Sequence, residues 1–275
     1  MRSLFVRVVI SVALLLTPSA PERVAAQPPY RILVTNDDGL RAPGLAALVR
    51  ALKPLGELSI VAPSVNQSGI GHAITLSDPI YVEQVTVEGI EATGLTATPA
   101  SCVRVALAKL LESRPDIVVS GVNRGSNFGL NAYISGTVAA AREAAMQGIP
   151  AIASALDITG DPDYGPAADA TAGVVRIVKS GGLPKGVFLN VNVPAGNELK
   201  GLKLTRQSST MGTERFEESK TPYGRRVLWS LFVQPTTAEP GSDVQAALDG
   251  YVAVTPLVAS EFSQRAFDEL RSRIK

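Results

Sequence analysis

Two adjacent carboxylates, Asp37 and Asp38, end an apolar run in the stretch ILVTNDDG at residues 32–39. Aspartate and glycine favour turns, so this stretch taken alone is an ordinary turn candidate. Two ionised carboxylates side by side repel each other, however, and a hard cation is the usual means of stabilising both. The pair therefore has two interpretations, a turn or half of a metal site, and the neighbouring motifs decide between them.

Two further polar, glycine-rich segments follow apolar runs, at residues 63–69 and 120–127. The first contributes Ser68 and the second contributes Asn123, and both carry neutral oxygens. Carboxylates combined with neutral oxygens favour magnesium, manganese or calcium, and such a set leaves positions for water and a phosphate oxygen. We therefore interpret Asp37, Asp38, Ser68 and Asn123 as the ligands of a metal ion.

A phosphate site is predicted at Ser135-Gly136-Thr137, which precedes an alanine-rich helical segment. Free backbone N–H groups at a helix start attract anions, and glycine permits close approach. Together with Asn127, these three residues are predicted to contact the substrate phosphate. The alternative is a simple serine or threonine N-cap.

Several classes of protein are excluded by what the sequence contains. The chain has one histidine, His72, and one cysteine, Cys102, which exclude a histidine-rich zinc site and an internal disulfide. We interpret His72 as structural or outside the first ligand shell, and Cys102 as a packed core thiol. The sequence has neither the G-x-S-x-G turn of serine hydrolases nor the glycine patterns of ATP or nicotinamide binding. With 26 basic and 25 acidic residues, it also lacks the excess positive charge of proteins that bind long nucleic acid.

The elements that must position these residues alternate between short apolar runs and helical patterns, which predicts an α/β fold with a Rossmann-like, mostly parallel sheet and flanking helices. Strands are predicted at residues 30–35, 58–62, 81–87, 117–119, 151–155, 187–193, 228–233 and 251–254. Helices are predicted at residues 43–52, 103–111, 137–147, 167–179 and 261–274, and residues 207–226 are expected to form an extended excursion. Ligands bind at the carboxyl ends of parallel strands, so the three polar segments are expected to meet at one edge of the sheet.

The first 26 residues are predicted to be a secretory signal peptide. Arg2 and Arg7 accompany an apolar stretch at residues 8–16, and small residues precede a cleavage site after Ala26. The apolar stretch is far shorter than the roughly 20 residues of a spanning helix. We expect an exported protein, periplasmic or secreted, with no membrane contact after cleavage. Residues 27–275 are expected to form one domain, with a core at about 30–200 and a C-terminal extension at about 201–275.

The ordered motifs of this chain resemble those of the SurE survival-protein family over roughly residues 30–257. Each is weak alone, but their combination in this order is specific. The motifs are NDDG with Ala42-Pro43-Gly44, Ala62-Pro63 with Gln67-Ser68-Gly69, Ser120-Gly121-Val122-Asn123-Arg124-Gly125, Ser135-Gly136-Thr137-Val138, Leu189-Asn190-Val191-Asn192-Val193-Pro194, and the stretch from Asp243 to Leu257.

The resemblance implies a metal-dependent 5′-nucleotidase-type phosphatase that acts on nucleoside 5′- and 3′-monophosphates, with some activity on short polyphosphate. It implies the same four metal ligands, one Mg²⁺ or Mn²⁺ per subunit, and a C-terminal extension with a hairpin or arm that exchanges between subunits of a dimer or tetramer. Most members lack a signal peptide, so a cytoplasmic location is the alternative to export. The chain departs from the family at Ile134, where tyrosine is common, and at Ser101, where aspartate is usual.

The predicted reaction is in-line attack of a metal-activated water on phosphorus, with Asp37 or Asp38 as general base or nucleophile. One alternative is a broad-specificity phosphatase or exopolyphosphatase that uses the same site. The other is a metal- and nucleotide-binding module without turnover.

Overall fold

The computed structural model describes residues 28–158, 160, 162–196, 198–210, 212–233, 235 and 237–274. The predicted signal peptide lies outside these residues. Within the described part of the chain, no helix is long and apolar enough to cross a membrane.

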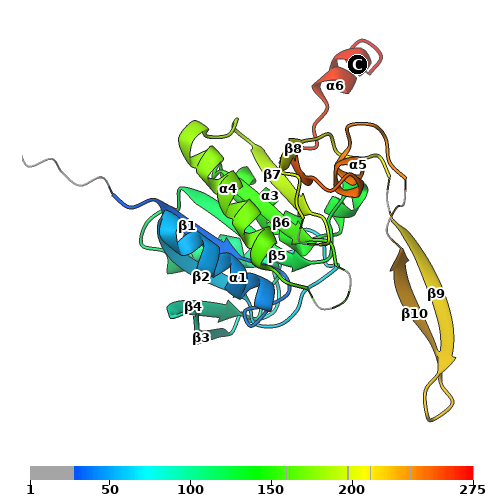
Figure 1. Ribbon diagram of the computed structural model, residues 1–275, viewed down its shortest axis with the longest axis horizontal. Helices are drawn as coiled ribbons and strands as arrows, with labels where there is room; N and C mark the ends of the chain where they lie inside the picture. The colour runs from blue at the N-terminus through cyan, green and yellow to red at the C-terminus, as the bar shows by residue number, and fades with distance from the viewer. Residues whose placement is uncertain are drawn as a thin grey trace, which may run out of the picture.

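A nine-stranded sheet forms the centre of the molecule, with helices on both faces (Figure 1). Its spatial order is β3-β4-β2-β1-β5-β6-β7-β11-β8. Neighbouring strands from β4 to β7 are parallel, whereas β3 pairs antiparallel with β4, and β11 pairs antiparallel with β7. The strands are β1 (Arg31–Thr35), β2 (Glu57–Pro63), β3 (Val82–Val87), β4 (Ile90–Leu95), β5 (Ile117–Arg124), β6 (Ala151–Leu156), β7 (Val187–Val193), β8 (Leu202–Leu204) and β11 (Val252–Val258).

Two helices cover each face of the sheet. Helices α1 (Pro43–Leu52) and α4 (Gly165–Gly181) share one apolar core, in which Leu48 and Val175 are fully buried. Helices α2 (Pro99–Val105) and α3 (Gly136–Met146) share the core on the other face with Val118 and Phe188. Cys102 belongs to this second core and is fully buried, as predicted. The mostly parallel sheet and the flanking helices confirm the predicted fold class.

The order in which strands are added to the sheet reverses at β1. From β1 the chain builds outward through β2 and β4, and it then returns to the other side of β1 to add β5, β6 and β7. In open α/β sheets, ligands bind at the carboxyl ends of the strands where the order reverses. Asp37 and Asp38 follow β1, and Asn123 lies near the end of β5, so the fold brings the predicted ligands to this point.

The predicted helix at residues 103–111 is wrong at its start and end. The helix α2 begins at Pro99 behind Thr98, whose side chain accepts a hydrogen bond from the Ser101 N–H at 3.3 Å. A π-helical turn, Ala106–Leu110, follows it. The threonine N-cap and the proline in the first turn are start signals that outweigh the later apolar spacing.

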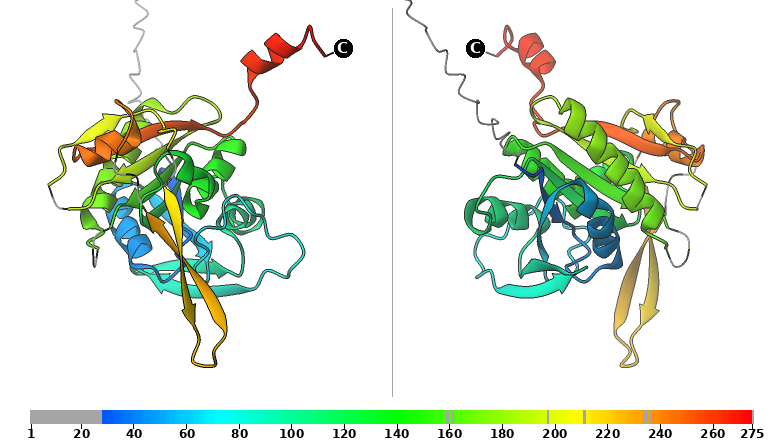
Figure 2. Two further views of the ribbon diagram at one scale, coloured as in Figure 1. Left: turned by 90° about the vertical axis from the view of Figure 1, so that its right-hand side faces the viewer. Right: turned by 60° about the vertical axis from the view of Figure 1, so that its left-hand side comes forward.

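The extended excursion predicted at residues 207–226 contains a strand, which is half of a hairpin in the C-terminal extension. Strands β9 (Thr213–Lys220) and β10 (Arg226–Val233) form an antiparallel hairpin that stands away from the body (Figures 1 and 2). Every residue of β9 is exposed, so this strand lacks the buried face that produces a period-two pattern. The short helix α5 (Asp243–Leu248) was not predicted, and the terminal helix α6 (Gln264–Leu270) is shorter than expected.

Candidate metal and phosphate site

Asp37 is a buried carboxylate directly after β1, with 2% of its surface exposed. The Thr137 hydroxyl donates a hydrogen bond to Asp37 Oδ1, and the Gln67 N–H donates to the Asp37 carbonyl at 2.7 Å. Burial raises the pKa of Asp37 to about 6, the charge of Asp38 adds to the rise, and the Thr137 hydrogen bond opposes it. The ionised form is thus disfavoured until a positive charge compensates it.

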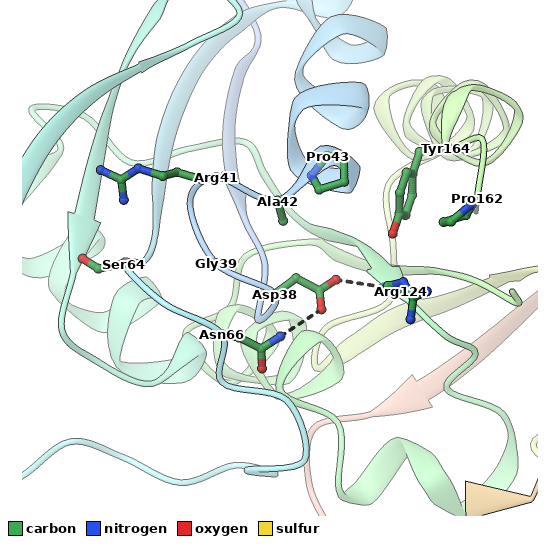
Figure 3. Close-up of a pocket in the computed structure, with 10 residues that line it drawn as sticks. All are labelled: Asp38, Gly39, Arg41, Ala42, Pro43, Ser64, Asn66, Arg124, Pro162 and Tyr164. Atoms are coloured by element: carbon green, nitrogen blue, oxygen red, sulfur yellow. Dashed lines mark hydrogen bonds between the residues drawn. The ribbon is translucent and has the colours of Figure 1, made fainter. Parts of the chain in front are cut away.

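Asp38 is less buried and faces a pocket (Figure 3). Its Oδ2 accepts a hydrogen bond from the Arg124 backbone N–H at 2.8 Å, and Asn66 Nδ2 lies 3.5 Å from Oδ1. The Ser68 hydroxyl also donates to this carboxylate. Burial raises the pKa of Asp38, while the bonds from Arg124 and Ser68 lower it. The structure therefore brings Ser68 beside Asp38.

Asn123 presents an amide oxygen at the same edge of the sheet. Its Nδ2 donates to the Gly125 carbonyl at 2.6 Å, so Oδ1 is the atom of this side chain that could bind a cation. Two carboxylates, a hydroxyl and an amide oxygen are the donor types that hard divalent cations prefer. Among the described residues, no group of three or more His, Cys, Asp or Glu side chains is placed to hold a metal. The donor set fits Mg²⁺ or Mn²⁺.

Helix α3 begins in direct contact with Asp37. A Cβ at Gly136 would lie 2.8 Å from Asp37 Cβ and 3.0 Å from Asp37 Oδ2, so only glycine permits this approach. The Ser135 hydroxyl accepts the Val138 N–H at 3.1 Å and is therefore an N-cap, while the Thr137 hydroxyl is bound to Asp37. Both predicted hydroxyls are already engaged within the protein. The first N–H groups of α3 have no intrahelical partner and remain the groups suited to a phosphate.

Asn127 lies between β5 and α3, and its backbone is bound by β7. The Asn127 N–H donates to Asn192 Oδ1 at 2.7 Å, and the Asn127 carbonyl accepts from Asn190 Nδ2 at 2.8 Å. Its own Nδ2 is buried and has no hydrogen-bond partner. Buried amides are almost always paired, so this atom indicates a place for a ligand or water.

A buried charge cluster surrounds Glu143 and was not predicted from the sequence. This side chain is fully buried on α3, with His72 Nε2 at 3.0 Å and Arg104 Nε at 2.9 Å from its two oxygens. Burial opposes ionisation, but the hydrogen bonds from His72, Arg104 and Gln147 outweigh it and lower the pKa of Glu143 to about 2. The cluster links the segment after Ser68 to α2 and α3. No spacing pattern in the sequence connects its members.

The two departures from the family pattern occupy different environments. Ser101 is 2% exposed, and its hydroxyl accepts hydrogen bonds from the Thr75 N–H at 2.8 Å and from the Thr98 hydroxyl at 3.0 Å. Tyr133 and Ile134 are about half exposed. Ser101 is therefore a structural hydrogen-bonding residue between α2 and the segment after Ser68.

A pocket of about 530 Å³ opens beside Asp38 (Figure 3). Its walls include the side chains of Arg124, Asn66 and Tyr164, and the Tyr164 hydroxyl is turned towards Arg124. Arg41 lies on the far side and forms a bidentate ion pair with Glu83 at 2.9 and 3.1 Å. A volume of this size is typical of small-molecule sites.

The fold and the site define an α/β protein with two carboxylates and neutral oxygen donors gathered at the switch point of its sheet. A family model described as survival protein SurE matches residues 32–214. A relative called 5′-nucleotidase SurE, from Christiangramia forsetii, is 42% identical over 82% of this chain and 90% of its own length. Another, called 5′-nucleotidase SurE 1, from Thermus thermophilus, is 44% identical over 82% of this chain and 91% of its own length. The crystal structure of the SurE protein from Aquifex aeolicus is similar with a TM-score of 0.77 and 35% identity, covering 89% of this chain and all of that one. The chain belongs to the SurE family, as its motifs predict.

Proposed function

We propose that this protein is a metal-dependent phosphomonoesterase that hydrolyses nucleoside 5′- and 3′-monophosphates to a nucleoside and phosphate. The observation that carries the proposal is the buried Asp37 beside Asp38 at the switch point of the sheet, in contact with the start of α3. The relatives named 5′-nucleotidase SurE, which match over most of their length, support the substrate class.

The metal site proposed here consists of Asp37, Asp38, Ser68 and Asn123, with one Mg²⁺ or Mn²⁺ per subunit. The cation, when bound, supplies a Lewis acid for the phosphoryl group and lowers the pKa of a water molecule. We assign the general base to Asp38, because this carboxylate lines the pocket whereas Asp37 is buried and bound to Thr137.

The phosphoryl oxygens are stabilised in this proposal by groups on the loop before α3 and on its first turn. Asn127 contributes its unpaired Nδ2, and Gly136 and Thr137 contribute backbone N–H groups. Ser135 acts by capping the helix that presents them. Donors that are fixed in place before the reaction stabilise the charge of the transition state without further reorganisation.

The leaving group occupies the pocket beside Asp38. Arg124, Asn66 and the Tyr164 hydroxyl can bind the sugar and base of a nucleoside. The Arg124 guanidinium in this pocket also favours a second candidate function, a broad phosphatase or exopolyphosphatase, because a cation suits an anionic leaving group. Rates on a nucleotide panel, sugar phosphates and tripolyphosphate separate the two functions.

The deciding experiment measures phosphate release by the purified protein with Mn²⁺, with EDTA, and as the Asp37→Asn variant. We expect EDTA and Asp37→Asn to abolish release. The Asp78→Asn variant, altered on an exposed loop, serves as the matched control and keeps full activity. Activity that survives EDTA and Asp37→Asn contradicts the metal site, and nucleotide binding without release supports the non-catalytic alternative.

Export after cleavage behind Ala26 is part of the proposal and is supported by Arg2, Arg7 and the apolar stretch at residues 8–16. The mature protein would then meet nucleotides and phosphate esters outside the cytoplasm. N-terminal sequencing of the protein from its own host tests this point. A first residue of Gln27 is expected, and an intact Met1 contradicts export.

Self-association through the β9–β10 hairpin is the last part of the proposal. Trp229, Leu228 and Phe216 are each more than half exposed on this hairpin, and apolar side chains lie on both of its faces. An isolated hairpin is only marginally stable in water, so a second copy of the chain is the partner that we propose for it in a dimer or tetramer.

A further inference from the structure

Two asparagines on β7, Asn190 and Asn192, have no role in the function proposed above. They are 1% and 0% exposed, and they are two residues apart on one strand, so their side chains project from the same face of the sheet. Polar amides at such positions are costly unless their hydrogen bonds are made. Their partners therefore indicate what they do.

Both amides bind the backbone of Asn127. Asn192 acts as a substitute for a peptide group, because its Oδ1 accepts the Asn127 N–H at 2.7 Å while its Nδ2 lies 3.4 Å from the Asn127 carbonyl. Asn190 Nδ2 donates to the same carbonyl at 2.8 Å. A residue of an irregular loop is thereby held through both of its backbone groups, as a residue in a sheet is.

The Asn127 side chain completes this arrangement. It is 7% exposed, and its Nδ2 has no partner within the protein. A buried amide without a hydrogen bond is destabilising, and a bound oxygen atom would accept the missing bond. The bonds from β7 fix the position of the Asn127 backbone, from which this amide projects.

We propose that Asn192, assisted by Asn190, is a positioning residue that holds Asn127 so that its side-chain amide meets a phosphoryl oxygen. This inference rests on the proposed function for the identity of the ligand. Asn192 acts only through Asn127 and does not touch the substrate.

A double-mutant cycle tests the inference with Asn127→Ala, Asn192→Leu and the combined variant. We expect each single change to lower kcat/KM for a nucleoside monophosphate by roughly a hundredfold to a thousandfold, the range for loss of one transition-state donor. The combined variant should match Asn127→Ala within about twofold, because residues that act as a unit are not additive. Multiplying effects would show that Asn192 acts independently, and they would overturn the inference.

The matched control is Thr171→Val, which removes hydrogen bonds to Ser154 and to the Ala167 carbonyl at a fully buried position on the opposite face. It should lower the melting temperature and leave kcat/KM unchanged. Asn190→Leu, which removes a single bond to the loop, is the milder variant if Asn192→Leu does not fold. A positioning role is contradicted if Asn190→Leu and Asn192→Leu behave like Thr171→Val, with lower stability but unchanged kcat/KM.

Calorimetric titration of inorganic phosphate, in the presence of Mn²⁺, separates this inference from the proposed function. Phosphate affinity should fall in Asn192→Leu and in Asn127→Ala but not in Thr171→Val. Should the wild type bind phosphate yet release none from any ester, the proposed function fails and loss of affinity in Asn192→Leu still supports the inference. Unchanged affinity in Asn192→Leu overturns it.

Discussion

The buried carboxylate of Glu143 should make this fold sensitive to acid. Its oxygens bind His72 at 3.0 Å and Arg104 at 2.9 Å, and none of the side chain is exposed. A pKa of about 2, against an ordinary value of 4.5, corresponds to about 3 kcal/mol of stabilisation of the folded state. Because Arg104 is 45% exposed, solvent screening reduces this value to about 2 kcal/mol.

The sign of the effect follows from the lowered pKa. The stabilisation is fully present above a pH of about 4.5 and is lost as the pH falls towards about 2, because the unfolded chain binds the proton first. Replacement of Glu143 by glutamine keeps the shape and removes the charge. The variant should therefore unfold about 2 kcal/mol more easily than the wild type at neutral pH, and the two proteins should converge in acid.

Urea denaturation followed by far-UV circular dichroism, in EDTA and at one protein concentration, measures this difference across the pH range. The control is Glu269→Gln, which breaks a pair with the same Nε-to-oxygen distance of 2.9 Å to Arg265 but on an exposed helix face. This control should have no measurable effect. A loss of stability in Glu143→Gln that is equal at every pH would show that packing, rather than charge, accounts for it.

Three further outcomes are expected. Gly136→Ala should lower Mn²⁺ affinity and kcat by more than about tenfold, because the added Cβ would press on the Asp37 carboxylate. The control Gly173→Ala, with open space around it, should stabilise α4 by about 0.5–1 kcal/mol and leave metal binding unchanged. Equal effects of the two variants on metal binding would contradict this prediction. Arg124→Ala keeps its backbone N–H and should raise KM for a nucleotide while leaving kcat nearly unchanged, and a fall in kcat alone would place Arg124 in the chemical step. Trp229→Ser on the hairpin should reduce the mass measured by analytical ultracentrifugation without changing activity per site in the smaller species, and an unchanged mass would contradict assembly through this hairpin.

The meeting of the polar segments at one edge of the sheet could be predicted from sequence because its signals are local. The apolar run of β1 ends directly at Asp37, and the order of strands and helices implies a parallel sheet whose carboxyl edge gathers the polar segments. The start of α3 was likewise evident from Ser135-Gly136, where a helix-capping residue precedes an alanine-rich segment.

The elements that were missed lack a local signal. Strand β9 has no buried face, and β4 contains Glu91 and Gly94 within six residues, so neither shows a clear period. The partners of Glu143 and Asn127 are equally hidden. Glu143 lies 71 residues from His72, and Asn127 lies 65 residues from Asn192, so only the folded arrangement of the sheet reveals these contacts.

The contact between Asp37 and the start of α3 also bears on the order of folding events. It joins residues 100 positions apart, the bond from Arg124 to Asp38 spans 86, and the support from β7 spans 65. Closing such long loops costs chain entropy before any contact compensates for it, so they form late relative to local turns and helices. In a partly folded chain in which β7 has not yet joined the sheet, the two aspartates can be in place, but Asn127 is not yet held in position to bind phosphate. Recovery of phosphate release during refolding should therefore follow, and never precede, completion of the parallel sheet.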